Sequence, residues 1–337
     1  MTKLLCALFL CLALPASAAP TDELLQKINA HVVRVQVALA NGGYGVGSGV
    51  VVAKDQIVTN CHVVANATNI NVVSNGENFA VSAIKPDWHH DICIIKVDGL
   101  NAPIATIGSS KNLKYEQPVF AIGYPDFSTS ACATFGFVKG LFPMDDSVII
   151  RATSTFRQGA SGGGLFDDDG NLVGIITLKS PGRNAYYYDL PVEWVQALLN
   201  QPEQAINSKS ELPFWAVAEE QWPFFMRVVQ PYITEDWQSL LTVATAWVEQ
   251  EPNSADAWFY LAAAEYATKD ISTAENHLHK VVAMNNQHSQ AIYYLGLIAE
   301  ANGKRMEALT NVALLNNLDV DAADQLKLAM GITPDQR

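Results

Sequence analysis

The stretch Gln158-Gly159-Ala160-Ser161-Gly162-Gly163-Gly164 says most about the fold, and the run Leu172-Val173-Gly174-Ile175-Ile176-Thr177 follows it. A serine between glycines lies in a tight turn that a second reactant can approach, because glycine tolerates backbone angles forbidden to other residues. A run rich in valine and isoleucine is typical of a buried strand. Such glycine turns are common, so the meaning of this one depends on the sequence around it.

Short β-rich runs occupy the chain outward from this turn, from Val32 to about Pro191, and Gly, Pro, Asn and Asp separate them. The clearest runs are residues 31–37, 49–53, 70–73, 92–97 and 148–150. Asp169-Gly170-Asn171 predicts a hairpin, and short helices are predicted after a cap at Thr21 or Asp22 and over 192–199. Many short strands joined by turns predict an antiparallel barrel or sandwich.

The pattern becomes helical beyond about Gln201, where β-branched residues thin out and apolar residues recur at helical spacing. A shift of 34 residues superposes Leu261 on Leu295. This periodicity resembles that of tetratricopeptide (TPR) repeats, with units at about 255–288 and 289–322. About three such units are needed for a free-standing array. We therefore expect this short array to pack against another part of the chain.

Five of the seven tryptophans lie at the start of the helical half. They are Trp215, Trp222, Trp237, Trp247 and Trp258. We interpret them mainly as core and as a docking surface against the β-rich half, with a ligand-binding aromatic groove as the alternative. The segment from Trp237 to Glu251 is expected to be the second helix of an earlier, degenerate repeat unit.

Composition excludes two broad classes of protein. The chain has 337 residues, of which 49% are hydrophobic, and a formal net charge of −13. The hydrophobic share is too high for a chain without a folded core. The negative charge argues against nucleic-acid binding, which requires clustered Lys and Arg. Residues 201–337 carry 8 basic and 18 acidic residues, against 12 and 16 in residues 19–200. Most of the acidity therefore bears on a partner of the helical half.

The first residues resemble a secretory signal peptide. Lys3 precedes the apolar run Leu4–Leu14, and Ala16-Ser17-Ala18 supplies a cleavage signal of small residues. We predict cleavage after Ala18 and a soluble exported protein, periplasmic or secreted. No later stretch approaches the roughly 20 apolar residues of a membrane span.

Three residue types in a fixed chain order indicate nucleophilic catalysis. His62 follows the run Ile57-Val58-Thr59-Asn60, Asp91 precedes Ile92-Cys93-Ile94-Ile95, and Ser161 lies in the glycine turn. A serine hydroxyl needs a base to take its proton, and a histidine oriented by a carboxylate is well suited to that. Backbone N–H groups around a serine flanked by glycines can stabilise an oxyanion.

These segments resemble the trypsin-like serine proteases of the HtrA/Deg branch from about Ala30 to Leu199. The resemblance implies a fold of two antiparallel β-barrels with His62 as general base, Asp91 as its orienting carboxylate and Ser161 as nucleophile. The N–H groups of Gly159 and Ser161 would form the oxyanion hole.

The same resemblance implies a substrate pocket for the residue before the cleaved bond. Its walls would be Thr155, Phe156, Thr177, Leu178, Lys179 and Tyr186. The bulky side chains at 186–188 predict a shallow pocket for small apolar side chains.

Three cysteines remain after removal of the leader: Cys61, Cys93 and Cys132. Relatives usually hold small buried residues at the first two positions, so we expect Cys61 and Cys93 to be buried free thiols, with a bridge between them as the alternative. His89 and His90 are interpreted as loop residues. No histidine or carboxylate cluster has convincing metal-ligand spacing, so we expect neither a metal nor another cofactor.

The sequence thus predicts a multidomain β + α protein, a double trypsin-like antiparallel β-barrel followed by a short TPR-like helical array. The segments are residues 1–18 (signal peptide), 19–200 (protease domain), 201–213 (linker) and 214–337 (TPR-like domain). The predicted function is that of an exported serine endopeptidase that acts on proteins or peptides and binds a protein partner through its helices. The alternatives are a catalytically silent adaptor that binds peptides or proteins through the TPR-like helices, and an esterase with the same triad.

Overall fold

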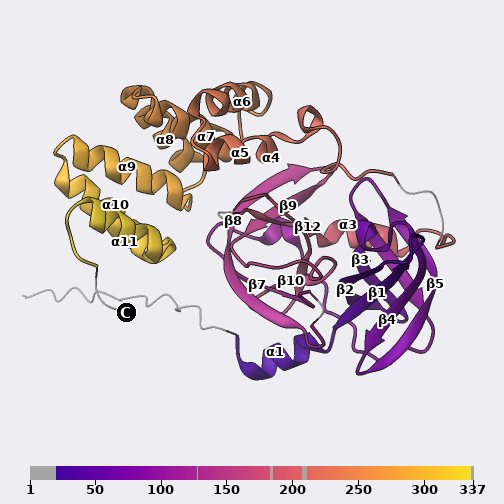
Figure 1. Cartoon of the computed structure of the whole chain (residues 1–337). Coiled ribbons are helices and arrows are strands. Elements are labelled where there is room, and N and C mark those ends of the chain that lie inside the picture. Colours follow the sequence, from indigo (N-terminus) through magenta and orange to yellow (C-terminus); the bar gives the residue numbers. More distant parts are fainter. Residues whose placement is uncertain (1–19, 127, 183–184, 207–210, 335–337) are drawn as a thin grey trace, which may run out of the picture.

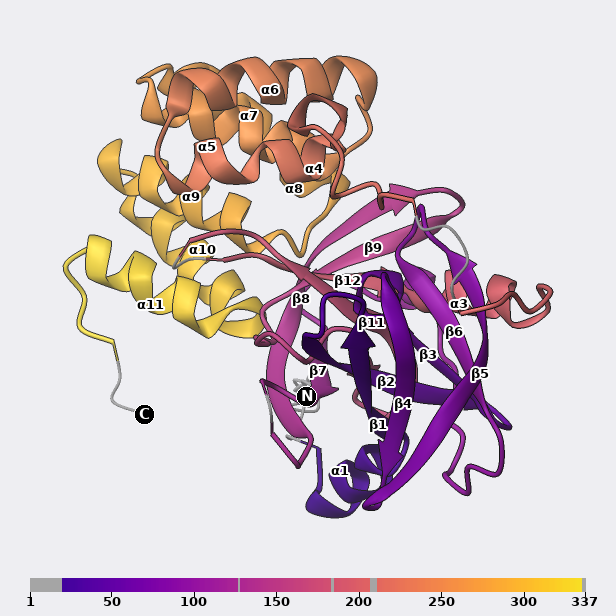
Figure 2. The ribbon, with the colours of Figure 1, turned by 45° about the vertical axis from the view of Figure 1, so that its right-hand side comes forward.

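The computed structural model describes residues 20–126, 128–182, 185–206 and 211–334. Two β-barrels are followed by a helical region, and the second barrel lies between the first and the helices (Figures 1 and 2). The predicted signal peptide lies outside the described residues. Within the described ranges, no helix is both long and apolar enough to cross a membrane.

The first barrel closes with the strand order β1-β2-β3-β6-β5-β4, and its neighbouring strands are antiparallel. Its strands are β1 (Val32–Leu39), β2 (Tyr44–Ala53), β3 (Gln56–Asn60), β4 (Ala67–Ser74), β5 (Glu77–Asp87) and β6 (Ile92–Val97). Their alternating Val and Ile side chains fill the interior, where Val35, Ile57 and Ile95 are fully buried. Helix α1 (Asp22–Asn29) precedes the barrel, and Thr21 caps it as predicted.

The second barrel closes in the order β10-β11-β12-β9-β8-β7. Its strands are β7 (Pro118–Gly123), β8 (Cys132–Met144), β9 (Ser147–Ala152), β10 (Gly164–Asp167), β11 (Leu172–Lys179) and β12 (Tyr187–Pro191). The predicted hairpin joins β10 to β11, and Gly170 takes the left-handed angle that its turn requires, with φ of +81°. A short 3₁₀ turn η1 (Ser110–Asn112) precedes β7, and helix α3 (Val192–Leu199) spans the predicted residues. The expectation of a double antiparallel barrel is confirmed.

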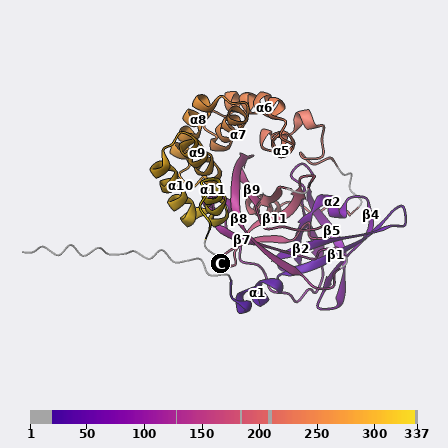
Figure 3. The ribbon, with the colours of Figure 1, turned by 60° about the vertical axis from the view of Figure 1, so that its left-hand side comes forward.

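The helical region follows as an arc around the second barrel (Figure 3). Its elements are η2 (Glu219–Gln221), α4 (Phe224–Arg227), α5 (Val229–Ile233), α6 (Trp237–Gln250), α7 (Ala255–Ala267), α8 (Ile271–Met284), α9 (Ser289–Ala301), α10 (Arg305–Leu318) and α11 (Val320–Ala329). Polar side chains cap most of these helices at their first turn, namely Asp236, Ser254, Asp270, His288 and Asp319.

Two helix pairs repeat at the predicted period. Helices α7 and α9 begin 34 residues apart, at Ala255 and Ser289, and α8 and α10 do the same at Ile271 and Arg305. Small residues allow the close packing, because a Cβ atom on Gly296 would lie 2.3 Å from a methyl carbon of Leu326 in α11. The matching register means that the second pair repeats the local structure of the first.

The helical region packs directly on the second barrel. Apolar contacts include the stacked rings of Phe142 on β8 and Phe225 on α4, 4.5 Å apart, and Trp247 lies 6.3 Å from Phe142. The docking role expected for the tryptophans is therefore confirmed for Trp247, which is buried. A second set of side chains in this contact is polar, and all but the half-buried Tyr115 are buried. We call it the polar seam. Its members are Tyr115, Arg151, Asp256, Tyr260 and His288.

Candidate active site

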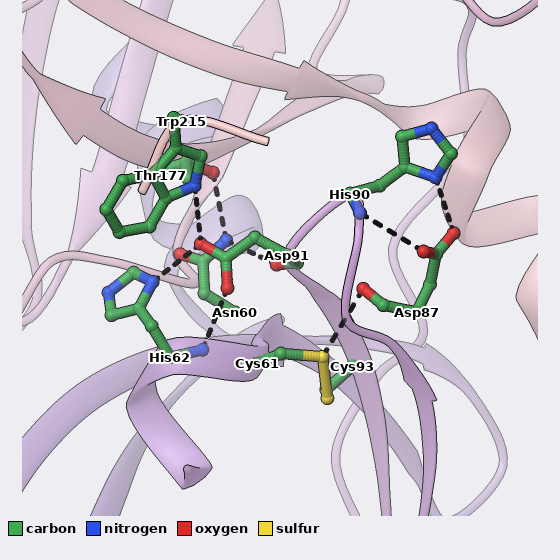
Figure 4. The surroundings of a disulfide bond; sticks show 9 residues. All are labelled: Asn60, Cys61, His62, Asp87, His90, Asp91, Cys93, Thr177 and Trp215. Carbon is green, nitrogen blue, oxygen red and sulfur yellow. Dashed lines mark hydrogen bonds and ion pairs between the residues drawn. A yellow bond between two sulfur atoms is a disulfide. The ribbon is translucent and has the colours of Figure 1, made fainter. Parts of the chain in front are cut away.

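His62 and Asp91 form a paired contact in the first barrel. His62 lies in the short helix α2 (Cys61–Val64), which begins where β3 ends. Its Nδ1 lies 2.6 Å from Asp91 Oδ2, and its backbone N–H donates to Asp91 Oδ1 at 2.8 Å (Figure 4). The Asp91 side chain is 1% exposed, whereas that of His62 is 32% exposed. A buried carboxylate thus orients a histidine that solvent or substrate can still reach.

Several backbone contacts fix Asp91 just before β6. Its φ is +59°, a left-handed angle that aspartate adopts more readily than most residues. Its carbonyl oxygen accepts from the Cys61 N–H at 3.2 Å and from Asn60 Nδ2 at 3.0 Å. The start of the His62 helix and the loop of Asp91 are therefore held to each other.

A disulfide bond joins Cys61 to Cys93 across the same place (Figure 4). The expectation that these cysteines are free thiols was wrong. Strand β3 pairs with β6 so that Thr59 faces Cys93, and this register brings Cys61 within 4.8 Å of Cys93 between Cα atoms. Because one cysteine precedes His62 and the other follows Asp91 by two residues, the bond links the segment that carries His62 to the segment that carries Asp91. Cys132 is exposed and free.

Ser161 lies in the loop before β10 and lines the same cavity as His62 and Gly159, a space of about 720 Å³. The Ser161 hydroxyl donates to the Thr177 carbonyl at 3.4 Å. No hydrogen bond joins it to His62 among the contacts of the described residues. Such bonds are often long before a substrate binds. The structure therefore brings His62 and Ser161 to one cavity, with Asp91 buried behind His62, and leaves the contact between Ser161 and His62 open.

The loop before β10 leaves two N–H groups open. Gly159 has a φ of +92°, and a Cβ atom there would lie 2.7 Å from the Tyr124 carbonyl oxygen, so no other residue fits without a shift. The N–H groups of Ala160, Gly162 and Gly163 donate within the protein. Those of Gly159 and Ser161 have no acceptor in the described part of the chain. The pair expected to form the oxyanion hole is thus available to a ligand.

Ser48 on β2 holds this loop from the first barrel, and sequence reasoning missed its role. Its N–H donates to the Ser161 carbonyl at 2.8 Å, and its hydroxyl donates to the Gly159 carbonyl at 2.9 Å. The hydroxyl also accepts from the Tyr124 N–H, and the Ser48 carbonyl accepts from Thr59 Oγ1. The only sequence signal was its place between Gly47 and Gly49.

The residues predicted to line the substrate pocket fall into two groups. Thr177, Leu178 and Lys179 line a second cavity of about 340 Å³ that also reaches His62. Its other walls come largely from the helical side of the chain: Trp215, Trp222, Met226, Val229 and Gln230.

The remaining predicted pocket residues make other contacts. The Thr155 carbonyl accepts from the Thr134 hydroxyl, and the Phe156 ring lies 5.0 Å from that of Tyr187. The Tyr186 ring lies under the guanidinium of Arg151 at 4.6 Å. These three residues line neither of the two cavities described above.

Apart from His62, Asp91 and Ser161, two clusters in the described part of the chain each bring three possible metal ligands within 4.8 Å of one another. They are His89, His90 and Asp145, and Glu275, His279 and Glu307. In the first cluster, both ring nitrogens of His90 already contact carboxylates, those of Asp87 and Asp145. Burial alone would lower the pKa of His90, but these contacts raise it above its usual value. The cluster is therefore explained by ion pairing without a metal.

Comparison with known proteins agrees with this geometry. Residues 47–175 match the trypsin-like peptidase domain. A probable periplasmic serine endoprotease of DegP-like type from Halomonas elongata is 33% identical over 164 residues, and a Pseudomonas putida relative of the same description is 34% identical over 164 residues. Each match covers 46% of this chain, which spans 34% of the length of either relative.

A solved structure shows the same fold. The active form of the Rv3671c protease from M. tuberculosis superposes with a TM-score of 0.51 at 21% identity, covering 57% of this chain and 92% of that one. The two barrels therefore have the fold of a trypsin-like peptidase. In sequence, the chain is similar to serine endoproteases of the DegP type over that part.

Proposed function

We propose that the protein is an exported serine endopeptidase that cleaves peptide bonds through His62, Asp91 and Ser161. The observation that carries this proposal is the short contact between His62 and the buried Asp91 carboxylate, beside the cavity that holds Ser161. The similarity to DegP-like endoproteases supports the reaction class, and their description as periplasmic supports export. No cofactor is needed for this chemistry.

The mechanism follows from these positions. The Ser161 hydroxyl turns from the Thr177 carbonyl toward His62, which takes its proton as the oxygen bonds to the peptide carbonyl carbon. The N–H groups of Gly159 and Ser161 stabilise the oxyanion. His62 then protonates the leaving amine as the C–N bond breaks, leaving an acyl-enzyme. Water, deprotonated by His62, releases the acid and restores Ser161.

The substrate preference proposed is for small apolar side chains before the cleaved bond. The cavity beside His62 supports an apolar preference on that side of the triad, because Leu178, Trp215 and Met226 line it. Cleavage of a mixed peptide library checks this. Dominance of Arg or Lys before the cut would contradict it.

We further propose that the helical region is TPR-like and binds a protein partner. The repeat of α7 and α8 as α9 and α10 after 34 residues supports the first part. The net acidity of residues 201–337 supports a partner with a basic surface.

One observation favours a different function, that of a catalytically silent adaptor. Ser161 donates to the Thr177 carbonyl and makes no hydrogen bond to His62 among the described contacts. In that case the barrels would cleave no peptide bond, and the TPR-like helices would bind peptides or proteins.

Labelling with a fluorophosphonate probe separates the two functions. The purified full chain should be labelled, and Ser161→Ala should abolish labelling and reduce peptide turnover by about 10⁴-fold or more. Ser82→Ala, in an exposed part of β5, is the matched control and should behave as wild type. Folded wild-type protein that takes up no label would favour the adaptor.

A further inference from the structure

A tryptophan from outside both barrels reaches the aspartate of the triad. The indole Nε1–H of Trp215 donates to Asp91 Oδ2 at 3.2 Å, the same oxygen that contacts His62 (Figure 4). The indole also packs edge to face with the imidazole of His62, with ring centres 5.5 Å apart and planes at 88°. One side chain therefore contacts both members of the pair.

The segment that carries Trp215 is tied to the loop of Asp91. The N–H of Phe214 donates to the His89 carbonyl at 3.0 Å, and the Phe214 side chain is buried. On the other side, Trp222 Nε1 donates to the Val217 carbonyl at 3.0 Å, which closes the segment on itself. Trp215 is thus anchored next to the triad before the first helix of the helical region begins.

The Asp91 carboxylate has few other donors. An ionised carboxylate without solvent needs hydrogen bonds to both oxygens. The hydroxyl of Thr177 lies near, but it donates to the Ile175 carbonyl at 2.9 Å and accepts from Asn60 Nδ2. Besides the two N–H groups of His62, the donor to this carboxylate in the described part of the chain is the indole of Trp215.

We propose that Trp215 is a positioning residue, which holds the Asp91 carboxylate ionised and aimed at His62 and so tunes the basicity of that histidine. The proposal rests on the proposed function for its effect on turnover, but its effect on His62 does not require turnover. It makes the segment leading into the helices a part of the active site.

Trp215→Phe removes the N–H donor and keeps an aromatic ring. The carboxylate then loses a partial positive charge, becomes a stronger acceptor and stabilises protonated His62 more. The pKa of His62 should therefore rise. The carboxylate is also placed by one hydrogen bond fewer, so kcat/KM on the plateau above that pKa should fall about tenfold, which is the value of one charge-assisted hydrogen bond. Other titratable groups also line the two cavities at His62. Lys179 and Tyr188 line the cavity that Trp215 lines, and Asp126 and Tyr44 line the cavity of Ser161. The substitution leaves all four in place.

The experiment is a pH titration of the His62 imidazole by NMR in the full chain, with the resonance assigned from His62→Gln. The pKa should rise in Trp215→Phe and stay unchanged in Trp258→Phe, a matched control whose indole bonds to Pro252 far from the triad. The acid limb of the kcat/KM profile should move in parallel. An unchanged His62 pKa in folded Trp215→Phe would overturn the proposal. Folded wild-type protein that does not react with the fluorophosphonate probe would instead overturn the endopeptidase function alone.

A measurement on the wild-type chain covers the case in which Trp215→Phe does not fold. As the pH is varied, the Trp215 indole N–H resonance should shift with a midpoint equal to the pKa of His62, because both groups contact Asp91 Oδ2. The Trp222 indole, bonded to a backbone carbonyl, should not follow that titration. An indole proton of Trp215 that is insensitive to the protonation of His62 would contradict the proposal.

Discussion

The barrel interiors and the polar seam are both buried, but they are built from opposite chemistry. Valine and isoleucine fill the first barrel, with Val35, Ile57 and Ile95 fully buried. In the seam, the buried guanidinium of Arg151 donates to the Tyr260 hydroxyl at 2.7 Å and to the Lys139 carbonyl. Apolar burial is non-directional, whereas a buried cation is stable only with its acceptors in place.

The contrast between the apolar barrel interiors and the polar seam indicates how the helical region is attached. The apolar barrel interiors gain stability from buried area and tolerate small rearrangements of similar side chains. The seam fixes one placement of the helices on the second barrel, because its directional hydrogen bonds join Tyr115 to Asp256 and Arg151 to Tyr260. A region held in this way has a defined position on the second barrel, and it can present a residue such as Trp215 to His62 and Asp91.

The largest expected effect on the free energy of unfolding comes from removing the disulfide bond of the first barrel. The double substitution Cys61→Ala with Cys93→Ala opens a loop whose ends are 32 residues apart in sequence. The free energy of unfolding should fall by about 3–4 kcal/mol, since the loss of the link frees the unfolded chain. Urea denaturation measures this. Cys132→Ser, at the exposed free cysteine, is the control, and a loss below about 1 kcal/mol in the double variant would refute the estimate.

That disulfide also marks where prediction from sequence stopped. The strands, the helix at 192–199 and the period of 34 residues were predictable, because periodicity and turn residues are local signals. The chain order of His62, Asp91 and Ser161 indicated the site for the same reason. The sequence offered the bridge only as the alternative to free thiols, since its formation depends on the register between β3 and β6.

Trp215 was harder still to find. It lies 124 residues from Asp91 in sequence, and its contact depends on how the segment at Phe214 packs on the loop of His89. No local pattern encodes such a contact. Phe156 and Tyr186 illustrate the same limit, because their partners, Tyr187 and Arg151, come from the way the strands of the second barrel pack.

Tyr260→Phe tests the polar seam and is expected to cost less stability than loss of the disulfide. The substitution makes the seam more apolar but leaves Arg151 Nη1 without its acceptor at 2.7 Å. The free energy of unfolding should fall by about 1.5–3 kcal/mol, the usual cost of a hydrogen bond to a charged group. Tyr266→Phe, in the same helix α7 with its ring against Tyr294, is the matched control and should change it by less than about 0.5 kcal/mol. A Tyr260→Phe variant as stable as the control would mean that the seam works by apolar area, as the barrels do.

The smallest expected effect is the pH dependence that the seam adds. Burial, together with the positive charges of Arg151 and Lys139, lowers the pKa of His288 to about 3, although Asp256 lies 4.0 Å from its Nε2. The Nδ1 atom caps α9 by accepting from the Ala291 N–H, and protonation there would break that cap. Because the folded pKa lies below the unfolded value of about 6.5, the unfolded chain binds more protons between these two pH values.

Stability should therefore be complete above about pH 6.5 and fall as the pH drops below it, by about 1–2 kcal/mol at pH 5 from His288 alone. His288→Asn keeps a capping side chain and does not titrate. Urea denaturation of both proteins at pH 7 and pH 5 should show the smaller acid-dependent loss in the variant. An equal loss in both would mean that His288 becomes protonated in the folded seam, with Asp256 as its counter-ion. The seam would then contain an ion pair between His288 and Asp256. Its chemistry would differ from that of the apolar barrels even more than it does with a neutral His288.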